Sequence, residues 1–403
     1  MTFFGCGGRN RADRQVSVVP IGHAGTMRIA AIGDAHLGRT ATTATTAEGV
    51  NAREFDFERS FEAAIAAALA TKPDLMVWLG DVFDHPRPNY RSFRVAMRAL
   101  ATIRDHGIGL VAISGNHDTP RLPGTGNPYA VLADAFPQFN FAYRLGYEHF
   151  DLPGLRVHAV PQTKTAEDAV EALHEADRNR SLDRVNVLLT HPLVHSVERR
   201  YADMNEIEIA DEELKSDHVL LGHYHVHTKV KPGVWYAGST DTFSFGDDPA
   251  KPKGFVLLDT ESGVCDHHGL TGQRPLLTPD FVYAAGRGPA EIQEEILEKL
   301  TALPAGAVAR LTLDLIEPEV YRLLDLPRIF NETSHLLHVK LDPVYAATTR
   351  VMDDLPELAT IAARWTTYLG DQDTDGFDAD RIRTTGQDYL NAAIDNAQEA
   401  GSD

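Results

Sequence analysis

From residue 27 onward, the chain alternates between two kinds of hydrophobic pattern. Short apolar runs of strand length recur, separated by stretches with apolar residues every three or four positions. The amphipathic stretches predict helices over residues 54–72, 90–107 and 165–179. The short runs predict strands at residues 27–33, 74–80, 108–114, 155–160, 184–190 and 217–223. Strands that alternate with helices along a chain indicate an α/β fold with a largely parallel sheet.

The pattern changes after a further apolar run at residues 253–259. A smaller unit follows, with a predicted helix at 289–303 and predicted strands at 307–316 and 335–342. Two more helical patterns complete the chain, at 353–369 and 378–399. We therefore expect a disordered leader at residues 1–26 and a main domain at residues 27–270. A smaller α/β domain would follow at residues 271–345, and a helical, acidic C-terminal segment at residues 346–403.

Composition narrows the class of protein. The chain has 403 residues, of which 43% are hydrophobic and 24% are charged, as in ordinary globular proteins. Two cysteines, Cys6 and Cys265, provide no disulfide framework, which favours a cytoplasmic protein. Because no stretch approaches the roughly 20 apolar residues of a membrane span, we expect no membrane segment. The net charge of −20 argues against a large basic surface, so a polyanionic substrate would need metal ions, a local patch or a partner.

Polar side chains cluster just after the predicted strands, where the chain leaves each strand. In parallel α/β sheets, ligands bind beyond the carboxyl ends of the strands. Five strand ends would therefore bring acidic, amide and imidazole groups to one edge. These groups are Asp34, His36, Asp81, Asp84, Asn116, His117, His191, His223 and His225.

This set of side chains suits divalent metal ions. Carboxylate, carboxamide and imidazole groups bind Mn²⁺, Fe or Zn²⁺, and no thiolate is among them. Their number exceeds what one catalytic metal takes. It matches two ions about 3.5–4 Å apart that share a carboxylate, the arrangement used for phosphoryl displacement. Taken singly, each of these residues would be read as a cap of a helix or turn. Taken together, they indicate a two-metal site.

The order of the motifs resembles that of a known superfamily. The series D-x-H, GD-x-x-D, GNH-D, H and GH-x-H is similar to that of the calcineurin-like metallophosphoesterases. Within that superfamily the chain resembles the Mre11/SbcD-type DNA exonuclease branch, through GDAHLG, WYAGSTDTFSFGD and KGFVLLD. The resemblance implies a four-layer α-β-β-α sandwich with a smaller α/β capping domain and a helical C-terminal segment.

The resemblance also implies a role for each site residue. One metal would be held by Asp34, His36 and His225, the other by Asn116, His191 and His223, with Asp81 bridging the two. His117 would act as general acid, and Asp84 would orient His117 by accepting its second N–H. We expect two divalent ions, with Mn²⁺ favoured and Fe or Zn²⁺ open.

The function implied is a two-metal phosphodiesterase acting on DNA, as the nuclease subunit of an SbcCD or Mre11–Rad50-like repair complex. The C-terminal helices would contact an SbcC/Rad50-like coiled-coil ATPase, and a homodimer is left open. One alternative is a phosphoesterase for a nucleotide, lipid or phosphoprotein, which the acidic balance favours. The other alternative is a metal-binding scaffold that regulates a partner ATPase.

Overall fold

The computed structural model describes residues 27–122, 125–197, 206–247, 251–346, 365 and 378–400. The predicted leader and the predicted helix at 353–369, apart from Trp365, lie outside these ranges. Among the described residues, no helix combines the length and the apolar character that crossing a membrane requires.

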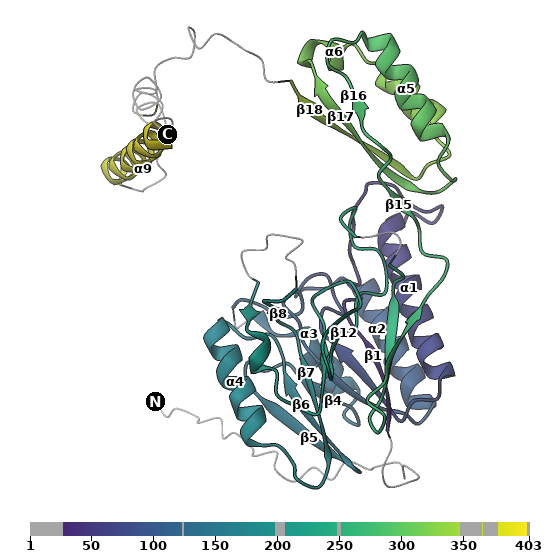
Figure 1. The fold of residues 1–403 in the computed structure, drawn as a ribbon, viewed down its shortest axis with the longest axis vertical. Coiled ribbons are helices and arrows are strands. Elements are labelled where there is room, and N and C mark those ends of the chain that lie inside the picture. Colours follow the sequence, from purple (N-terminus) through teal and green to yellow (C-terminus); the bar gives the residue numbers. More distant parts are fainter. Residues whose placement is uncertain are drawn as a thin grey trace, which may run out of the picture. The chain divides into compact units, whose positions relative to one another are not determined.

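The first sheet has six strands and contains the first three of the five strand ends that carry polar residues (Figure 1). Its order is β14-β13-β1-β2-β3-β4, and β1 to β4 run parallel to one another. β13 and β14 extend the sheet antiparallel. The strands are β1 (Arg28–Ile32), β2 (Leu75–Leu79), β3 (Gly109–Ile113), β4 (Asn140–Ala142), β13 (Gly254–Asp259) and β14 (Cys265–Gly269).

A second sheet of six strands carries the remaining predicted strand ends. Its order is β11-β12-β10-β7-β6-β5, with a parallel centre of β6, β7, β10 and β12 and an antiparallel strand at each edge. The strands are β5 (Glu148–Leu152), β6 (Leu155–Val160), β7 (Val185–Thr190), β10 (His218–Leu221), β11 (Thr228–Lys231) and β12 (Val234–Tyr236).

Alternation along the strands produces four layers. In β1, Ile29 and Ala31 join the core between the two sheets, while Ala30 and Ile32 face the helices. The helices on that outer face are α1 (Ala52–Ala70), α2 (Tyr90–Asp105) and α3 (Pro128–Ala135). On the far face of the second sheet lies α4 (Ala166–Arg178). The expected α-β-β-α sandwich is therefore confirmed.

The residues at and after Thr165 explain where helix α4 begins and what it packs against. The Thr165 side chain caps the helix by accepting a hydrogen bond from the Asp168 backbone N–H at 3.1 Å. Ala169, Ala172, Leu173 and Ala176 then form its buried face. The helix is thus fixed by one cap and one apolar stripe against the second sheet.

The C-terminal part contains a smaller sheet in which β17 pairs with β15, β16 and β18. Its strands are β15 (Leu276–Leu277), β16 (Val282–Tyr283), β17 (Val308–Ile316) and β18 (His338–Tyr345). The helices are α5 (Pro289–Thr301), α6 (Pro318–Arg322), α7 (Leu326–Glu332) and α9 (Ala379–Ala400). The predicted helix at 378–399 is thus present as α9.

The chain divides into two compact units. One runs to Val282 and includes Gly288–Leu313 and Leu324–Asp342; the other takes Tyr283–Arg287, Asp314–Leu323 and the residues from Pro343 onward. The predicted domain boundaries at residues 270 and 345 stay a prediction. The first unit also contains a short pair of strands, β8 (Leu193–Val194) and β9 (Glu208–Ile209). A 3-10 turn, η2 (Asp211–Glu213), follows this pair.

Candidate metal centre

The polar strand ends meet where the carboxyl edges of the two large sheets approach each other. Asp34, Asp81 and Asn116 follow β1, β2 and β3 of the first sheet. His191 and His223 follow β7 and β10 of the second sheet. The sequence pattern had suggested one edge of one sheet. The structure instead forms the site from two edges, because the strands that carry these residues are buried on both faces and the two sheets stack.

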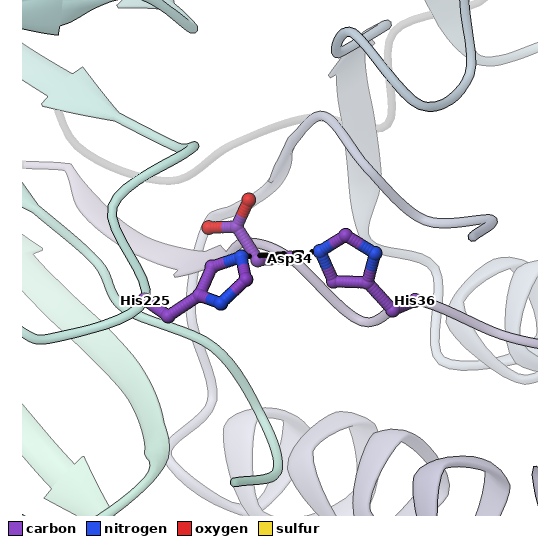
Figure 2. Close-up of side chains that lie close together, drawn as sticks. All are labelled: Asp34, His36 and His225. Carbon is purple, nitrogen blue, oxygen red and sulfur yellow. Dashed lines mark hydrogen bonds between the residues drawn. The ribbon is translucent and has the colours of Figure 1, made fainter. Parts of the chain in front are cut away.

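Asp34, His36 and His225 form the first donor cluster (Figure 2). Their ligand atoms all lie within 4.8 Å of one another. The ring nitrogens Nε2 of His36 and His225 face each other at 3.1 Å. Asp34 Oδ1 accepts a hydrogen bond from the His223 backbone N–H, while its buried Oδ2 has no hydrogen-bond partner. A cation between these atoms would give Asp34 Oδ2 the partner it lacks.

Asp81, His191, His223 and Asn116 form the second cluster. The ligand atoms of the first three lie within 4.8 Å of one another. Asn116 Oδ1 lies 3.2 Å from His191 Nε2 and 3.1 Å from His223 Nδ1. All seven predicted ligands therefore come together, although they start far apart in the sequence.

Asp81 lies between the two clusters. Its Oδ2 atom is 3.2 Å from His191 Nε2 in the second cluster and 3.9 Å from His36 Nε2 in the first. A carboxylate at this position can reach two ions at once, which is the arrangement expected of a bridging ligand.

The spacing of the donors fits a shared cation. Two donors bound to one ion at about 2.1 Å, at tetrahedral or octahedral angles, lie about 3.0–3.4 Å apart. The contacts from His36 to His225, and from Asn116 to His191 and His223, measure 3.1 to 3.2 Å. The residues present thus fit a site for two divalent ions.

Unusual backbone conformations concentrate at the same residues. Six non-glycine residues of the described chain have positive φ angles, and four of them are candidate ligands: Asp34, His36, Asp81 and His223. Such conformations cost about 1–3 kcal/mol each and persist where the surrounding structure imposes them. Their concentration where the edges of the two sheets meet points to function, because nothing in strand geometry requires it.

Burial and mutual charge perturb the pKa values of the cluster. Burial, reinforced by Asp81, raises the pKa of Asp34 to about 7. Burial alone would lower the pKa of His191, but the carboxylates of Asp81 and Asp34 outweigh it and raise this pKa to about 9. Because histidine binds metal through a deprotonated nitrogen, a cation here would replace the proton that these carboxylates attract.

His117 lies beside the clusters with its ring partly exposed. Its backbone N–H donates to Asp81 Oδ1 at 2.8 Å, and its ring packs edge-on against His36. The ring nitrogen Nδ1 donates to the backbone carbonyl of Asp84 at 2.9 Å. The expectation that the Asp84 carboxylate would accept this N–H needs correction.

The Asp84 carboxylate is engaged elsewhere. Its Oδ1 atom lies 4.0 Å from His117 Nδ1 but 3.1 Å from His36 Nδ1 and 3.3 Å from Arg39 Nη1. The buried His36 ring lies closer to the Asp84 carboxylate than His117 does, and it forms the hydrogen bond with this carboxylate. Asp84 thus orients a candidate ligand with its side chain and orients His117 with its main chain.

Sequence reasoning missed the residues that surround the clusters. A cavity of about 110 Å³ adjoins Asp81, Asn116, His117 and His223, and Phe243 and Glu206 also line it. The Phe243 ring packs against His36 and His225 with ring centroids 4.5 and 4.3 Å away. Phe243 belongs to the GSTDTF turn, whose pattern was visible in the sequence. Nothing in the sequence marked Glu206.

Comparison with known proteins is consistent with this geometry. The family model of the calcineurin-like phosphoesterases matches residues 27–227. A DNA double-strand break repair protein Mre11 from Methanocaldococcus jannaschii is 24% identical over 53% of this chain and 59% of its own. The protein of the same name from Haloferax volcanii is 28% identical over 67% of this chain and 58% of its own. The chain thus spans about three-fifths of these relatives.

A solved structure, the purple acid phosphatase from yellow lupin (Lupinus luteus) seeds, aligns with a TM-score of 0.35 at 15% identity. The alignment covers 59% of this chain and 50% of the phosphatase, and a TM-score this low carries no argument about the family.

The four-layer fold, the ordered motifs and the matched residues together define the class. The chain belongs to the calcineurin-like metallophosphoesterases through its domain at residues 27–227. Within that family it is similar to the Mre11 proteins, at 24% and 28% identity to the two named above.

Proposed function

We propose that the protein is a metal-dependent nuclease that hydrolyses phosphodiester bonds in DNA during double-strand break repair. The observation that carries the proposal is the convergence of seven candidate metal ligands from two sheets, four of which line one cavity. The name shared by the relatives, which concerns DNA double-strand break repair, supports DNA as the substrate.

In this proposal Asp34, His36 and His225 would hold one divalent ion, and Asn116, His191 and His223 would hold the other. Asp81, which lies between the two clusters, would serve both sites. When bound, the two ions would stabilise charge on the phosphate oxygens and activate an attacking water. Mn²⁺ is the metal we expect, and Fe or Zn²⁺ stays open, because carboxylate, amide and imidazole donors without a thiolate suit all three.

His117 is the proposed general acid. Because its Nδ1 donates to the Asp84 carbonyl, Nδ1 carries a proton and the ring is held in one orientation. Nε2 is then the nitrogen available to give a proton to the leaving oxygen, and the side chain lines the cavity. Asp118 supports this turn, since its buried carboxylate accepts hydrogen bonds from the backbone N–H groups of Val82, Phe83 and Gly115.

We infer that the protein works with a partner, an SbcC/Rad50-like coiled-coil ATPase contacted by the C-terminal helices. The net charge of −20 supports this inference, because an acidic chain gains from a partner that brings basic surface to DNA. Co-purification of the full chain with such an ATPase from its own cells tests the inference.

The activity is tested with labelled DNA and Mn²⁺. The wild-type protein should release nucleotides from DNA, and EDTA should stop the release. The proposal fails if no DNA is cleaved in Mn²⁺ while a small phosphoester is turned over efficiently.

Two variants separate the roles within the same assay. Asp81→Asn should lose bound metal and cleavage together, because the bridging carboxylate contacts both clusters. His117→Ala should keep both ions and lose about 10²–10⁴ in rate, the usual contribution of a general acid. Elemental analysis of the two variants provides the metal content. An Asp81→Asn protein that still holds two ions would contradict the bridging role.

A further inference from the structure

Three of the four candidate histidine ligands, His36, His191 and His223, share a pattern in how their outward nitrogens are bonded, whereas the buried Nδ1 of the fourth, His225, has no hydrogen-bond partner. In each of the three rings one nitrogen faces the other donors. For His36 the remaining nitrogen lies 3.1 Å from the Asp84 carboxylate, and for His191 it lies 2.6 Å from the backbone carbonyl of Leu79. For His223, Nδ1 faces Asn116 and Nε2 lies 3.0 Å from Glu206 Oε1. Glu206 therefore stands to His223 as Asp84 stands to His36.

We propose that Glu206 is the positioning residue of the second metal site. Its carboxylate accepts the hydrogen of His223 Nε2, so that Nδ1 keeps its lone pair directed at the position of the cation beside Asn116. The inference rests on the proposed function, because it assigns His223 to a metal ion.

The chemistry of neutral imidazole explains why such a partner matters. A neutral ring has one N–H and one lone pair, and the hydrogen bond at one nitrogen decides which nitrogen can bind metal. A carboxylate at Nε2 selects the tautomer with its lone pair on Nδ1 and makes that nitrogen a better ligand. Without an acceptor at Nε2, part of the population would place the hydrogen on Nδ1, where it would block the metal.

The location of Glu206 supports a built interaction. The side chains of His223 and Glu206 are only 13% and 8% exposed, so water competes little for this hydrogen bond. Glu206 directly precedes Ile207, whose carbonyl accepts the Leu193 backbone N–H at 2.9 Å. The pairing of β8 with β9 continues from there, so the segment that follows His191 also fixes Glu206.

Two substitutions at Glu206 test the role. Glu206→Gln keeps an oxygen acceptor without charge, and Glu206→Met keeps the length without an acceptor. Glu212→Ala is the control, because Glu212 is exposed on the same segment and its loss changes net charge equally. Nitrogen NMR of histidine-labelled, metal-free protein reports the tautomer of His223, assigned by the signal lost in His223→Asn. Titration calorimetry with Mn²⁺ reports the affinity of each ion.

We expect wild-type His223 to carry its hydrogen on Nε2. Glu206→Gln should keep that tautomer and bind the second ion less tightly, whereas Glu206→Met should shift the tautomer and lose about 10–100-fold in affinity for one ion. The other ion and the Glu212→Ala protein should be unaffected.

The inference is overturned if wild-type His223 carries its hydrogen on Nδ1, a result that needs no variant to fold. It is also overturned if Glu206→Met leaves both the tautomer and the two affinities unchanged. A wild-type protein that binds no divalent ion would instead defeat the proposed function, so the two failures are distinct.

Discussion

His158 and His191 are both buried histidines, and their neighbours give them opposite acid–base character. His191 lies beside two carboxylates, which raise its pKa to about 9. His158, in β6, has neutral partners: Nδ1 lies 2.9 Å from the Tyr147 hydroxyl and Nε2 lies 3.1 Å from Asn186 Oδ1. Burial lowers the pKa of His158 and outweighs the hydrogen bond with Asn186, which raises it; the positive charges of Arg156 and Arg180 lower it further. His158 is thus a structural histidine that stays neutral in the fold.

The lowered pKa of His158 predicts how the free energy of unfolding depends on pH. The unfolded chain takes up a proton at His158 below about pH 6.5, while the folded chain, with its lowered pKa, does so only at a lower pH. Between these pKa values the unfolded state binds more protons, so His158 makes the protein less stable as pH falls, by up to about 1.4 kcal/mol per unit. Relative to His158→Gln, the wild type should lose stability below about pH 6.5 and not above it. Urea unfolding across this range measures the difference, and parallel curves would contradict the prediction.

Sequence reasoning at the residue scale succeeded where motif and strand end coincide. Asp34, Asp81 and Asn116 each follow a strand whose hydrophobic pattern was clear, so their meeting at one edge could be foreseen. The partners of Asp84 and His223 could not be foreseen in the same way. They depend on how side chains in loops approach one another across sheets, and no local pattern of residues encodes that approach.

At the scale of elements, the central strands and the three longer helices of the main domain followed from period and length. Its short helix α3 and most of its edge or short strands, among them β4, β5, β11 and β14, were not predicted. The division into two sheets did not follow from period and length either. Along β1, β2 and β7 the residues on both faces of the strand are buried, so the hydrophobic pattern alone cannot tell which strands are neighbours. The layered arrangement came from the resemblance, and the structure supplies its physical reason, a core on each face of each sheet.

The junction between the two sheets predicts a strict requirement for glycine at residue 222. A Cβ there would collide with the Leu79 carbonyl oxygen and lie 2.6 Å from His191 Nδ1. Gly222→Ala should therefore lower the free energy of unfolding by about 1–3 kcal/mol and weaken metal binding, because His191 must move. Gly109→Ala is the matched control, since its Cβ would meet only Leu75 Cδ1 at an ordinary 3.5 Å. Urea unfolding and metal titration measure both, and equal effects of the two substitutions would contradict the requirement.

For the whole molecule, charge has to be considered together with the site. The chain carries a net charge of −20, yet the proposed ligands include only two carboxylates, Asp34 and Asp81. Two divalent ions would add four positive charges at that position and offset the carboxylates gathered there, which also include Asp84 and Glu206. Attraction to a phosphodiester would then be concentrated at the cavity rather than spread over the surface.

This distribution predicts a weak dependence of DNA binding on salt. The logarithm of the affinity falls with the logarithm of salt in proportion to the number of phosphates neutralised. A chain that holds DNA through one or two phosphates at the metals should lose no more than about tenfold in affinity between about 50 and 200 mM monovalent salt. Binding is best measured with His117→Ala at fixed Mn²⁺, so that DNA stays intact and both metal sites stay loaded. A loss of about a thousandfold would mean six or more contacts, and the isolated chain would then possess the extended basic surface that its composition argues against. The same titration repeated with the proposed ATPase partner bound should become steeper, because the added contacts would come from that partner.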